Sequence, residues 1–215
     1  MRRTKEDAEK TRIALLASAE RLFLDKGVAH TSLDQIARDA GVTRGAVYWH
    51  FQNKAHLFHE MLNQVRLPPE QLAARIYSCE GQALKTLRDL CIEAIESLGR
   101  DEQKKRIFTI LLHRCEFTEE LREAEERHHA FINEFIDLCE KLLASASDRL
   151  QPGVTPRLAA LALHGLIIGL FSDWTRDPKL FDPARDTAAL IDPMFRALIR
   201  DWHNVQETPV MSAPV

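Results

Sequence analysis

Apolar residues recur every three to four positions along nearly the whole chain, which is the spacing of one face of an α-helix. A first helix is predicted over residues 5–26, and Gly27 follows it as a typical stop signal. Its apolar face consists of Ile13, Leu16, Ala17, Leu22 and Phe23. No segment alternates apolar and polar residues with the period of two that strands require. The pattern therefore predicts an all-α protein.

Three short helices are predicted after the first one. Ser32 and Gln35 have the spacing of a capping box, and Gly41 ends the helix that they begin. Thr43 can cap the next helix, and a further helix follows it. A short helix, a turn with glycine and a second helix form a helix-turn-helix, here over about residues 32–51.

A pair of prolines, Pro68 and Pro69, interrupts the helical pattern and predicts a domain boundary. We therefore expect a helix-turn-helix domain over residues 1–66 and a second, helical domain over residues 67–203. Helices of the second domain are predicted at about residues 70–79, 83–98, 102–117, 119–145, 156–176 and 187–202. Residues 204–215 show no periodicity and are predicted to form a mobile tail.

The charge is unevenly distributed. The chain of 215 residues has a net charge of −3, which alone does not suggest a nucleic-acid partner. Residues 1–66, however, carry 11 Lys and Arg against 8 Asp and Glu, a net charge of +3, and the remaining residues carry −6. The asymmetry suggests a basic first domain on an acidic body, a pattern compatible with DNA binding by the first domain.

Neither secretion nor a membrane span is expected. The first residues are charged, and the longest apolar run, residues 158–171, is shorter than the ~20 residues of a span and contains His164. We expect this run to be a buried helix and the protein to be cytoplasmic. The cysteines have no paired spacing, so reduced core thiols are predicted at Cys79, Cys91, Cys115 and Cys139.

The second helix of a helix-turn-helix enters the major groove, where its first residues meet base edges. Here those residues are Thr43, Arg44, Gly45 and Ala46. Arg44 can donate two hydrogen bonds to guanine, Ala46 can touch a thymine methyl group, and Gly45 permits close approach. Thr43 can bind a phosphate.

Further positions around this helix are expected to hold the DNA backbone. Val47 and Phe51 lie four residues apart and are predicted to pack inward, whereas Trp49 suits either the core or a DNA contact. On spacing alone, a core helix explains the aromatic residues as well as a DNA-binding helix does. The predicted backbone contacts are Thr31, Ser32, Tyr48, His50 and Lys54.

An enzyme of the metal-containing helical-bundle class is the main alternative from another functional class. Glu125 and His128, like Glu126 and His129, have the Glu-x-x-His spacing of di-iron bundles, but that design needs a second such helix. No zinc-protease, hydrolase, P-loop or dinucleotide motif is present. We therefore expect no catalytic residue, metal or cofactor.

Residues 10–70 resemble the DNA-binding domain of the TetR family of bacterial repressors. The resemblance is carried by RLFLDKGVAHTSLDQIARDAGV, TRGAVYWHF and NKAHLF, in this order and with the family's spacing. The opening RRTKEDAEKTR and the later LLHRCEFTEEL are similar to the AcrR-like branch, which regulates multidrug efflux pumps.

The resemblance implies an all-α homodimer that represses transcription from a palindromic DNA operator, in association with the nucleoid. A small, largely apolar inducer would bind the second domain and release the operator. Candidate pocket residues, each of which also suits a core position, are Leu87, Cys91, Ile95, Phe108, Leu112, His113, Phe131, Phe135, Leu138, Ile167 and Phe171. Control by cysteine oxidation or by a protein partner, in place of a small molecule, stays open.

The last two long helices are expected to form the dimer, as in the family. Gly165 and Gly169 lie on one helix face and permit close approach of another helix, either within the chain or from a second copy. The candidate interface residues are Gly165, Gly169, Trp174, Phe195 and Trp202.

Overall fold

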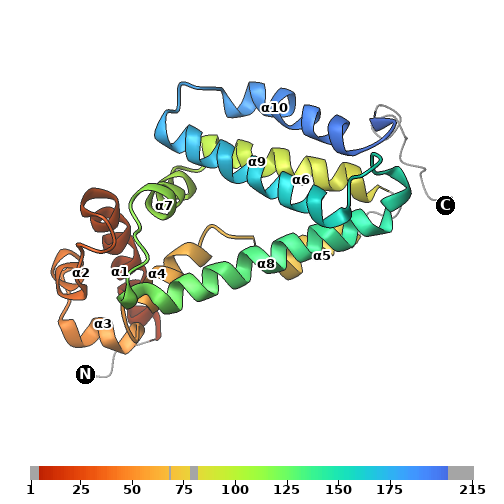
Figure 1. Ribbon diagram of the computed structural model, residues 1–215. Coiled ribbons are helices and arrows are strands. Elements are labelled where there is room, and N and C mark those ends of the chain that lie inside the picture. Colours follow the sequence, from red (N-terminus) through yellow and green to blue (C-terminus); the bar gives the residue numbers. More distant parts are fainter. Residues whose placement is uncertain (1–4, 68, 78–81, 203–215) are drawn as a thin grey trace, which may run out of the picture. The chain divides into compact units, whose positions relative to one another are not determined.

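The structure is a computed structural model that describes residues 5–67, 69–77 and 82–202 (Figure 1). The predicted tail at residues 204–215 and the predicted core thiol of Cys79 lie outside these residues. Within them all named elements are helical, and the only strand-like pairing is an isolated bridge between Leu150 and Ile199. The all-α prediction is therefore confirmed.

The helices follow one another along the chain with short connections. They are α1 (Lys5–Lys26), α2 (Leu33–Asp39), α3 (Arg44–His50), α4 (Lys54–Asn63), α5 (Pro69–Tyr77), α6 (Ala83–Arg100), α7 (Glu102–His113), α8 (Arg122–Ser145), α9 (Pro156–Arg176) and α10 (Pro183–Leu198), with 3-10 helices η1 (Glu119–Leu121) and η2 (Ser147–Arg149).

Several helix boundaries differ from the sequence-based expectation, among them the end of α7 and the start of α10. α7 ends at His113 instead of residue 117. The carbonyl of the next residue, Arg114, accepts a hydrogen bond from the Val28 amide at 2.9 Å instead of one from within the helix. α10 begins at Pro183 because the Asp182 side chain caps its first turn and proline suits a first helical position. Both differences arise at helix ends, where capping contacts compete with periodicity.

Contacts divide the chain into two compact units. The amino-terminal unit comprises residues 1–67, 101–132 and 175–177, and the carboxy-terminal unit comprises residues 68–100, 133–174 and 178–215. The first of these divisions falls after Leu67, one residue beyond the boundary expected after residue 66. The contacts also assign α7, η1 and the start of α8 to the same unit as the helix-turn-helix.

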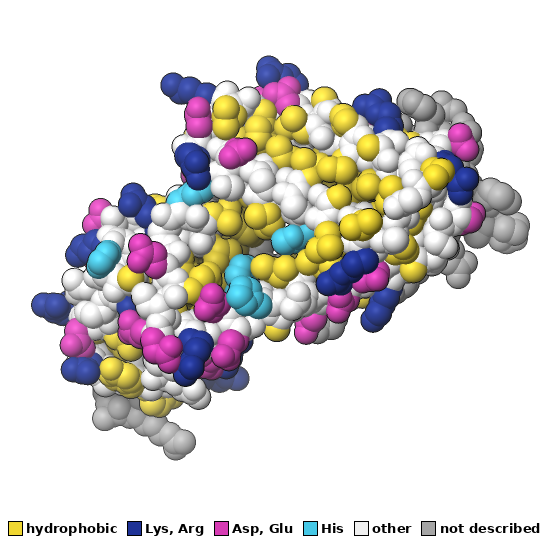
Figure 2. Space-filling model, viewed as in Figure 1, with side chains coloured by type: hydrophobic (Ala, Val, Ile, Leu, Met, Phe, Trp, Pro, Cys, Tyr) yellow, Lys and Arg dark blue, Asp and Glu magenta, His cyan; other side chains and the backbone are white. Residues whose placement is uncertain are grey.

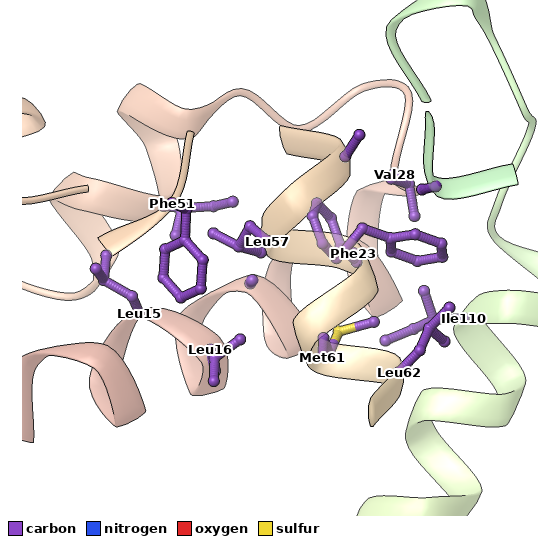
Figure 3. Packing of buried hydrophobic residues seen from close by; sticks show 14 of the residues in the cluster. Leu15, Leu16, Phe23, Val28, Phe51, Leu57, Met61, Leu62 and Ile110 are labelled. Carbon is purple, nitrogen blue, oxygen red and sulfur yellow. The ribbon is translucent and has the colours of Figure 1, made fainter. Parts of the chain in front are cut away.

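The core of the amino-terminal unit joins these segments (Figure 3). Phe23 of α1 meets Phe58 of α4 edge to face, with ring centroids 6.0 Å apart. Ile110 of α7 lies in the same cluster, next to Leu62, and is fully buried. A displacement of α7 would therefore disturb the core that holds α1 to α4, because protein interiors are close-packed.

In the carboxy-terminal unit, α10 packs along α6. Arg88 of α6 forms a two-pronged ion pair with Asp192 of α10, at 2.6 and 3.0 Å. The rings of Phe195 and Trp202 lie 4.9 Å apart in the core.

α9 is only partly buried. It is the one helix among the described residues that is long and apolar enough to cross a membrane, but a single such helix is weak support for a span. Only 33% of the most apolar stretch of α9 is buried, so the helix that was expected to be buried is exposed along one side. Hydrophobic side chains form a patch over α9 on the face shown in Figure 2.

Candidate nucleic-acid interface

The turn between α2 and α3 is shaped by local hydrogen bonds. Ser32 and Gln35 form the predicted capping box: the Ser32 hydroxyl accepts from the Gln35 amide at 3.3 Å, and the Ser32 amide donates to the Gln35 side chain at 2.8 Å. Gly41 ends α2 with a φ of +66°, a conformation that residues with a side chain rarely adopt. Thr43 caps α3 by accepting from the Ala46 amide at 3.3 Å.

α3 is anchored from one side and presents the other to solvent. Val47 is fully buried and Phe51 is 1% exposed, as the sequence predicts. On the opposite side, Tyr48 is 47% exposed and Trp49 is 73% exposed, and Arg44 and Gly45 are also exposed. Because α-helical residues four apart share a face, Arg44 with Tyr48 and Gly45 with Trp49 form two adjacent outward rows. Trp49 is therefore a surface residue, which excludes its predicted core role and leaves the DNA contact as a proposal.

Arg44 is held by partners that DNA could replace. Its Nε lies 3.1 Å from a carboxylate oxygen of Asp34, and its guanidinium lies 5.6 Å from the ring centroid of Tyr48, to whose hydroxyl it donates at 3.4 Å. The hydrogen bond to Tyr48 and the charge of Asp34 raise the pKa of Arg44. Sequence reasoning missed Asp34, since its pairing with Arg44 depends on how α2 and α3 cross.

Two predicted DNA contacts are engaged inside the protein. Lys54 is 3% exposed, and its ammonium group donates to the carbonyls of Val28 and Thr31 at 3.0 and 3.1 Å and lies 2.6 Å from Glu120. Thr31 is 1% exposed, and its hydroxyl donates to the Gly27 carbonyl at 2.8 Å. Both side chains are buried and hydrogen-bond to carbonyls of the loop before α2. They stabilise this loop and are not available to bind phosphates, contrary to the prediction. The other predicted backbone contacts, Ser32, Tyr48 and His50, keep exposure.

The predicted pocket residues fall into both units. Phe108, Leu112, His113 and Phe131 belong to the amino-terminal unit and are partly buried; His113 lies 3.0 Å from the Thr175 hydroxyl. In the carboxy-terminal unit, Phe135 lies 6.2 Å from the ring of His164. The remaining candidates in that unit are the buried Leu87, Cys91, Ile95, Leu138 and Phe171 and the partly buried Ile167.

The candidate dimer residues separate into two groups. Gly165 and Gly169 are exposed, and a Cβ added at either would meet no atom within 4 Å. Trp174, Phe195 and Trp202 are at most 6% exposed, and the Trp174 indole donates to the Phe181 carbonyl at 3.2 Å. These three rings pack within their own chain and are not offered to a partner.

The three cysteines that the structure describes are poorly suited to redox sensing. Burial raises the pKa of Cys91, Cys115 and Cys139 to about 12, and for Cys115 the nearby Glu125 carboxylate adds to the effect. Because the thiolate is the reactive form, oxidation of these thiols is disfavoured.

One histidine of the Glu-x-x-His pattern of α8, His128, contacts other residues of the amino-terminal unit. In the part of the chain that the structure describes, no group of three or more His, Cys, Asp or Glu side chains could hold a metal ion. His128 contacts Arg66 and stacks on Phe117.

Two family models match the chain. Residues 15–61 match the model of bacterial regulatory proteins of the tetR family, and residues 82–199 match the C-terminal region of MAATS-type transcriptional repressors. The chain is 35% identical over 201 residues to the HTH-type transcriptional regulator AcrR of Shigella flexneri, covering 90% of this chain and 93% of that protein.

Solved structures agree with the family models. The chain is 66% identical to NalD, the secondary repressor of the MexAB-OprM multidrug efflux pump in Pseudomonas aeruginosa, with a TM-score of 0.89 over 91% of this chain and 100% of that one. It is 29% identical to SmeT in complex with triclosan, with a TM-score of 0.76 over 95% and 98% of the two chains. SmeT is the repressor of the SmeDEF pump of Stenotrophomonas maltophilia.

Proposed function

Since this chain belongs to the TetR family of bacterial regulatory proteins, we propose that it represses a multidrug efflux pump operon and leaves its operator when a small molecule binds. The observation that carries the DNA-binding part is α3 itself. The helix is anchored by Val47 and Phe51 and presents Arg44, Gly45 and Trp49 outward. It is a non-enzymatic, cytoplasmic regulator in this proposal.

In this proposal, some exposed residues of α3 contact bases and others contact the DNA backbone. Arg44 exchanges its pairing with Asp34 for the edge of a guanine, while Gly45 and Ala46 permit close approach to the groove. Tyr48, Trp49 and His50 contact the sugar-phosphate backbone, together with Thr43 and Ser32 at the helix starts. These backbone contacts position the helix but carry little sequence information.

A palindromic operator requires two copies of α3, and the exposed face of α9 is suited to pair with itself. Leu158 is 56% exposed and Leu161 is 43% exposed, and Gly165 and Gly169 continue this side of the helix. An apolar face with glycines lets a second helix approach closely. We infer a homodimer formed through α9, in which each copy reads one half of the palindrome.

Control by a small molecule is supported by the relatives and by the amino-terminal core. NalD and SmeT repress multidrug pumps, and SmeT has been captured with triclosan. In this chain, α7 shares its core with α1 and α4, and Glu120 of η1 pairs with Lys54. A ligand that binds the DNA-free arrangement more tightly, and displaces these segments, would shift the population away from the operator. A small, largely apolar inducer is proposed.

Genome-wide mapping of bound sites tests the target. We expect a bound site beside an operon for an efflux transporter, with a palindrome of two half-sites about one helical turn apart. The operator found in this way is then used in vitro with candidate pump substrates. Bound sites without any transporter operon would contradict the efflux assignment, whereas an operator that no small molecule releases would contradict the inducer.

A further inference from the structure

Arg66 is a largely buried cation without an acidic partner. It follows α4, and burial lowers the pKa of its guanidinium to about 10, so the group is still charged at neutral pH. Among the residues that the structure describes, no carboxylate lies within 4 Å of it. Other arginines of the same unit do have acidic partners, among them Arg12 with Glu60, Arg21 with Asp39, and Arg106 with Glu20.

The contacts that Arg66 does make are with neutral groups. Its Nη2 donates to Nδ1 of His128, and its guanidinium lies 4.5 Å from the ring centroid of Phe131. Because a guanidinium has only donors, Nδ1 of His128 accepts and the proton of that ring lies on Nε2. The Nη1 atom of Arg66 is buried without any acceptor. An unpaired charged donor in a dry position is costly, and an anion would remove that cost.

A second buried donor lies within electrostatic range of Arg66. Nε2 of His59 is 3.0 Å from the amide nitrogen of Asn63, which can only donate, so the proton of the His59 ring lies on Nδ1. That Nδ1 is buried and has no partner. Burial, followed by the charges of Arg127 and Arg66, lowers the pKa of His59, and the ring is a neutral donor.

The surroundings of the guanidinium are aromatic. Phe117 stacks on His128, with centroids 6.1 Å apart and planes 17° apart, and Phe131 lies against Arg66 itself. Arg66 and Phe131 both keep partial exposure, so the site lies near the surface although Nη1 itself is buried. Aromatic groups beside a cation favour a flat, apolar ligand body attached to the charged group.

We propose that Arg66 binds the carboxylate of an aromatic organic acid, whose ring packs with Phe131 and His128. The fork of a guanidinium matches the two oxygens of a carboxylate, and Nη1 is a free donor for one of them. This inference rests on the proposed function, since it names a chemical class of inducer for the repressor.

The position of Arg66 connects this site to the DNA-binding helices. α4, which precedes Arg66, begins at Lys54, and Lys54 holds the carbonyls of the loop before α2. An acid that draws Arg66 out of its contact with His128 would pull on the end of α4. Binding of the acid would then be coupled to the position of Lys54, which holds the loop before α2, and so to the arrangement of α2 and α3.

The experiment measures charge preference without DNA. Purified full-length protein is titrated calorimetrically with 2-naphthoate and with its neutral analogue 2-naphthamide. We expect the wild type to bind the acid at least tenfold more tightly than the amide. Arg66→Gln should bring the ratio of the two affinities close to one, and Arg66→Lys, which keeps the charge but loses the fork, should give an intermediate ratio.

Arg185→Gln serves as the matched control, because Arg185 is an exposed arginine of the carboxy-terminal unit that pairs with Asp186. It should retain the wild-type ratio. The melting temperature of Arg66→Gln should equal or exceed that of the wild type, since the change removes a charge without an acidic partner. Equal affinities of the wild type for acid and amide, or no binding of the acid, would overturn the proposal. An unchanged ratio in Arg66→Gln would also overturn it, and a lower melting temperature of the same variant would then assign Arg66 a structural role.

Operator release, measured separately by fluorescence anisotropy, distinguishes this inference from the proposed function. If the acid binds with the expected preference but neither it nor any pump substrate releases DNA, the anion site stands and the induction mechanism fails. If neutral compounds release the operator and the acid does not bind, the induction mechanism stands and the anion site is overturned.

Discussion

α3 and α9 both expose large hydrophobic side chains, yet they are built for different partners. In α3, the exposed Tyr48 and Trp49 carry polar edges and stand beside the cation Arg44. In α9, the exposed Leu158 and Leu161 are aliphatic, and no charged residue interrupts residues 158–172. Exposed rings with a cation suit a polyanion with flat bases, whereas an aliphatic face suits another apolar surface. Exposure alone therefore does not identify a partner; the chemistry of the neighbours does.

The largest effect on α3 is expected for Arg44→Ala. The change removes the proposed guanine contact from both half-sites, so operator affinity should fall about tenfold to a hundredfold per half-site while nonspecific binding persists. Fluorescence anisotropy with operator and scrambled duplexes measures both affinities. Arg185→Ala, at an exposed arginine of α10, is the control and should bind as the wild type does. If Arg44→Ala keeps the wild-type preference for the operator over the scrambled duplex, Arg44 of α3 does not read the bases.

Lys54→Ala tests whether Lys54 stabilises the fold or binds a DNA phosphate. The change leaves buried loop carbonyls without their donor, so the free energy of unfolding should fall by about 3 kcal/mol. Urea denaturation followed by circular dichroism measures this. At a temperature where the variant is folded, the salt dependence of DNA binding should match the wild type. A flatter salt dependence with unchanged stability would instead identify Lys54 as a phosphate contact.

Leu161→Glu tests the face of α9. Each copy would bring a carboxylate into the proposed apolar interface, so dimer formation should weaken by about 2 kcal/mol or more, roughly thirtyfold. Light scattering over a concentration series gives the mass. Ala144→Glu, which places the same charge at an exposed position of α8 in the same unit, is the matched control. A dimer that persists unchanged in Leu161→Glu would place the interface elsewhere.

Ser32→Ala should have the smallest effect. It removes the hydroxyl of the capping box before α2, which typically costs about 1 kcal/mol. The melting temperature should fall by a few degrees, while the preference for the operator over a scrambled duplex is kept. Ser32→Asp, which can still cap the helix, should restore stability. Failure of the aspartate to do so would show that capping is not the role of this hydroxyl in stability.

Much of the helix-turn-helix was predictable because its determinants are local. The capping box of Ser32 and Gln35, the cap at Thr43 and the turn at Gly41 lie within a few residues of the groups that they bind. The inward direction of Val47 and Phe51 follows from helical periodicity. Contacts over such short distances along the chain leave a readable pattern.

The failures have a common origin in long-range contacts. Lys54 looked like a surface cation, but its acceptors lie 23 to 26 residues earlier in the chain, and their carbonyls carry no side-chain signal. Arg66 meets His128 across 62 residues. Trp174, Phe195 and Trp202 looked like interface anchors, but they are buried by the folding of their own chain.

The sequence by itself determined the all-helical class, the helix-turn-helix and the inward residues of α3, because periodicity, caps and glycine turns act within one or two helical turns. Only the tertiary structure decided which cations are free for DNA, which aromatic rings are buried, and that α7 shares a core with α1 and α4. Burial is a property of surfaces that segments far apart in the chain bring together, and it sets whether a charge is solvated, paired or in need of a ligand.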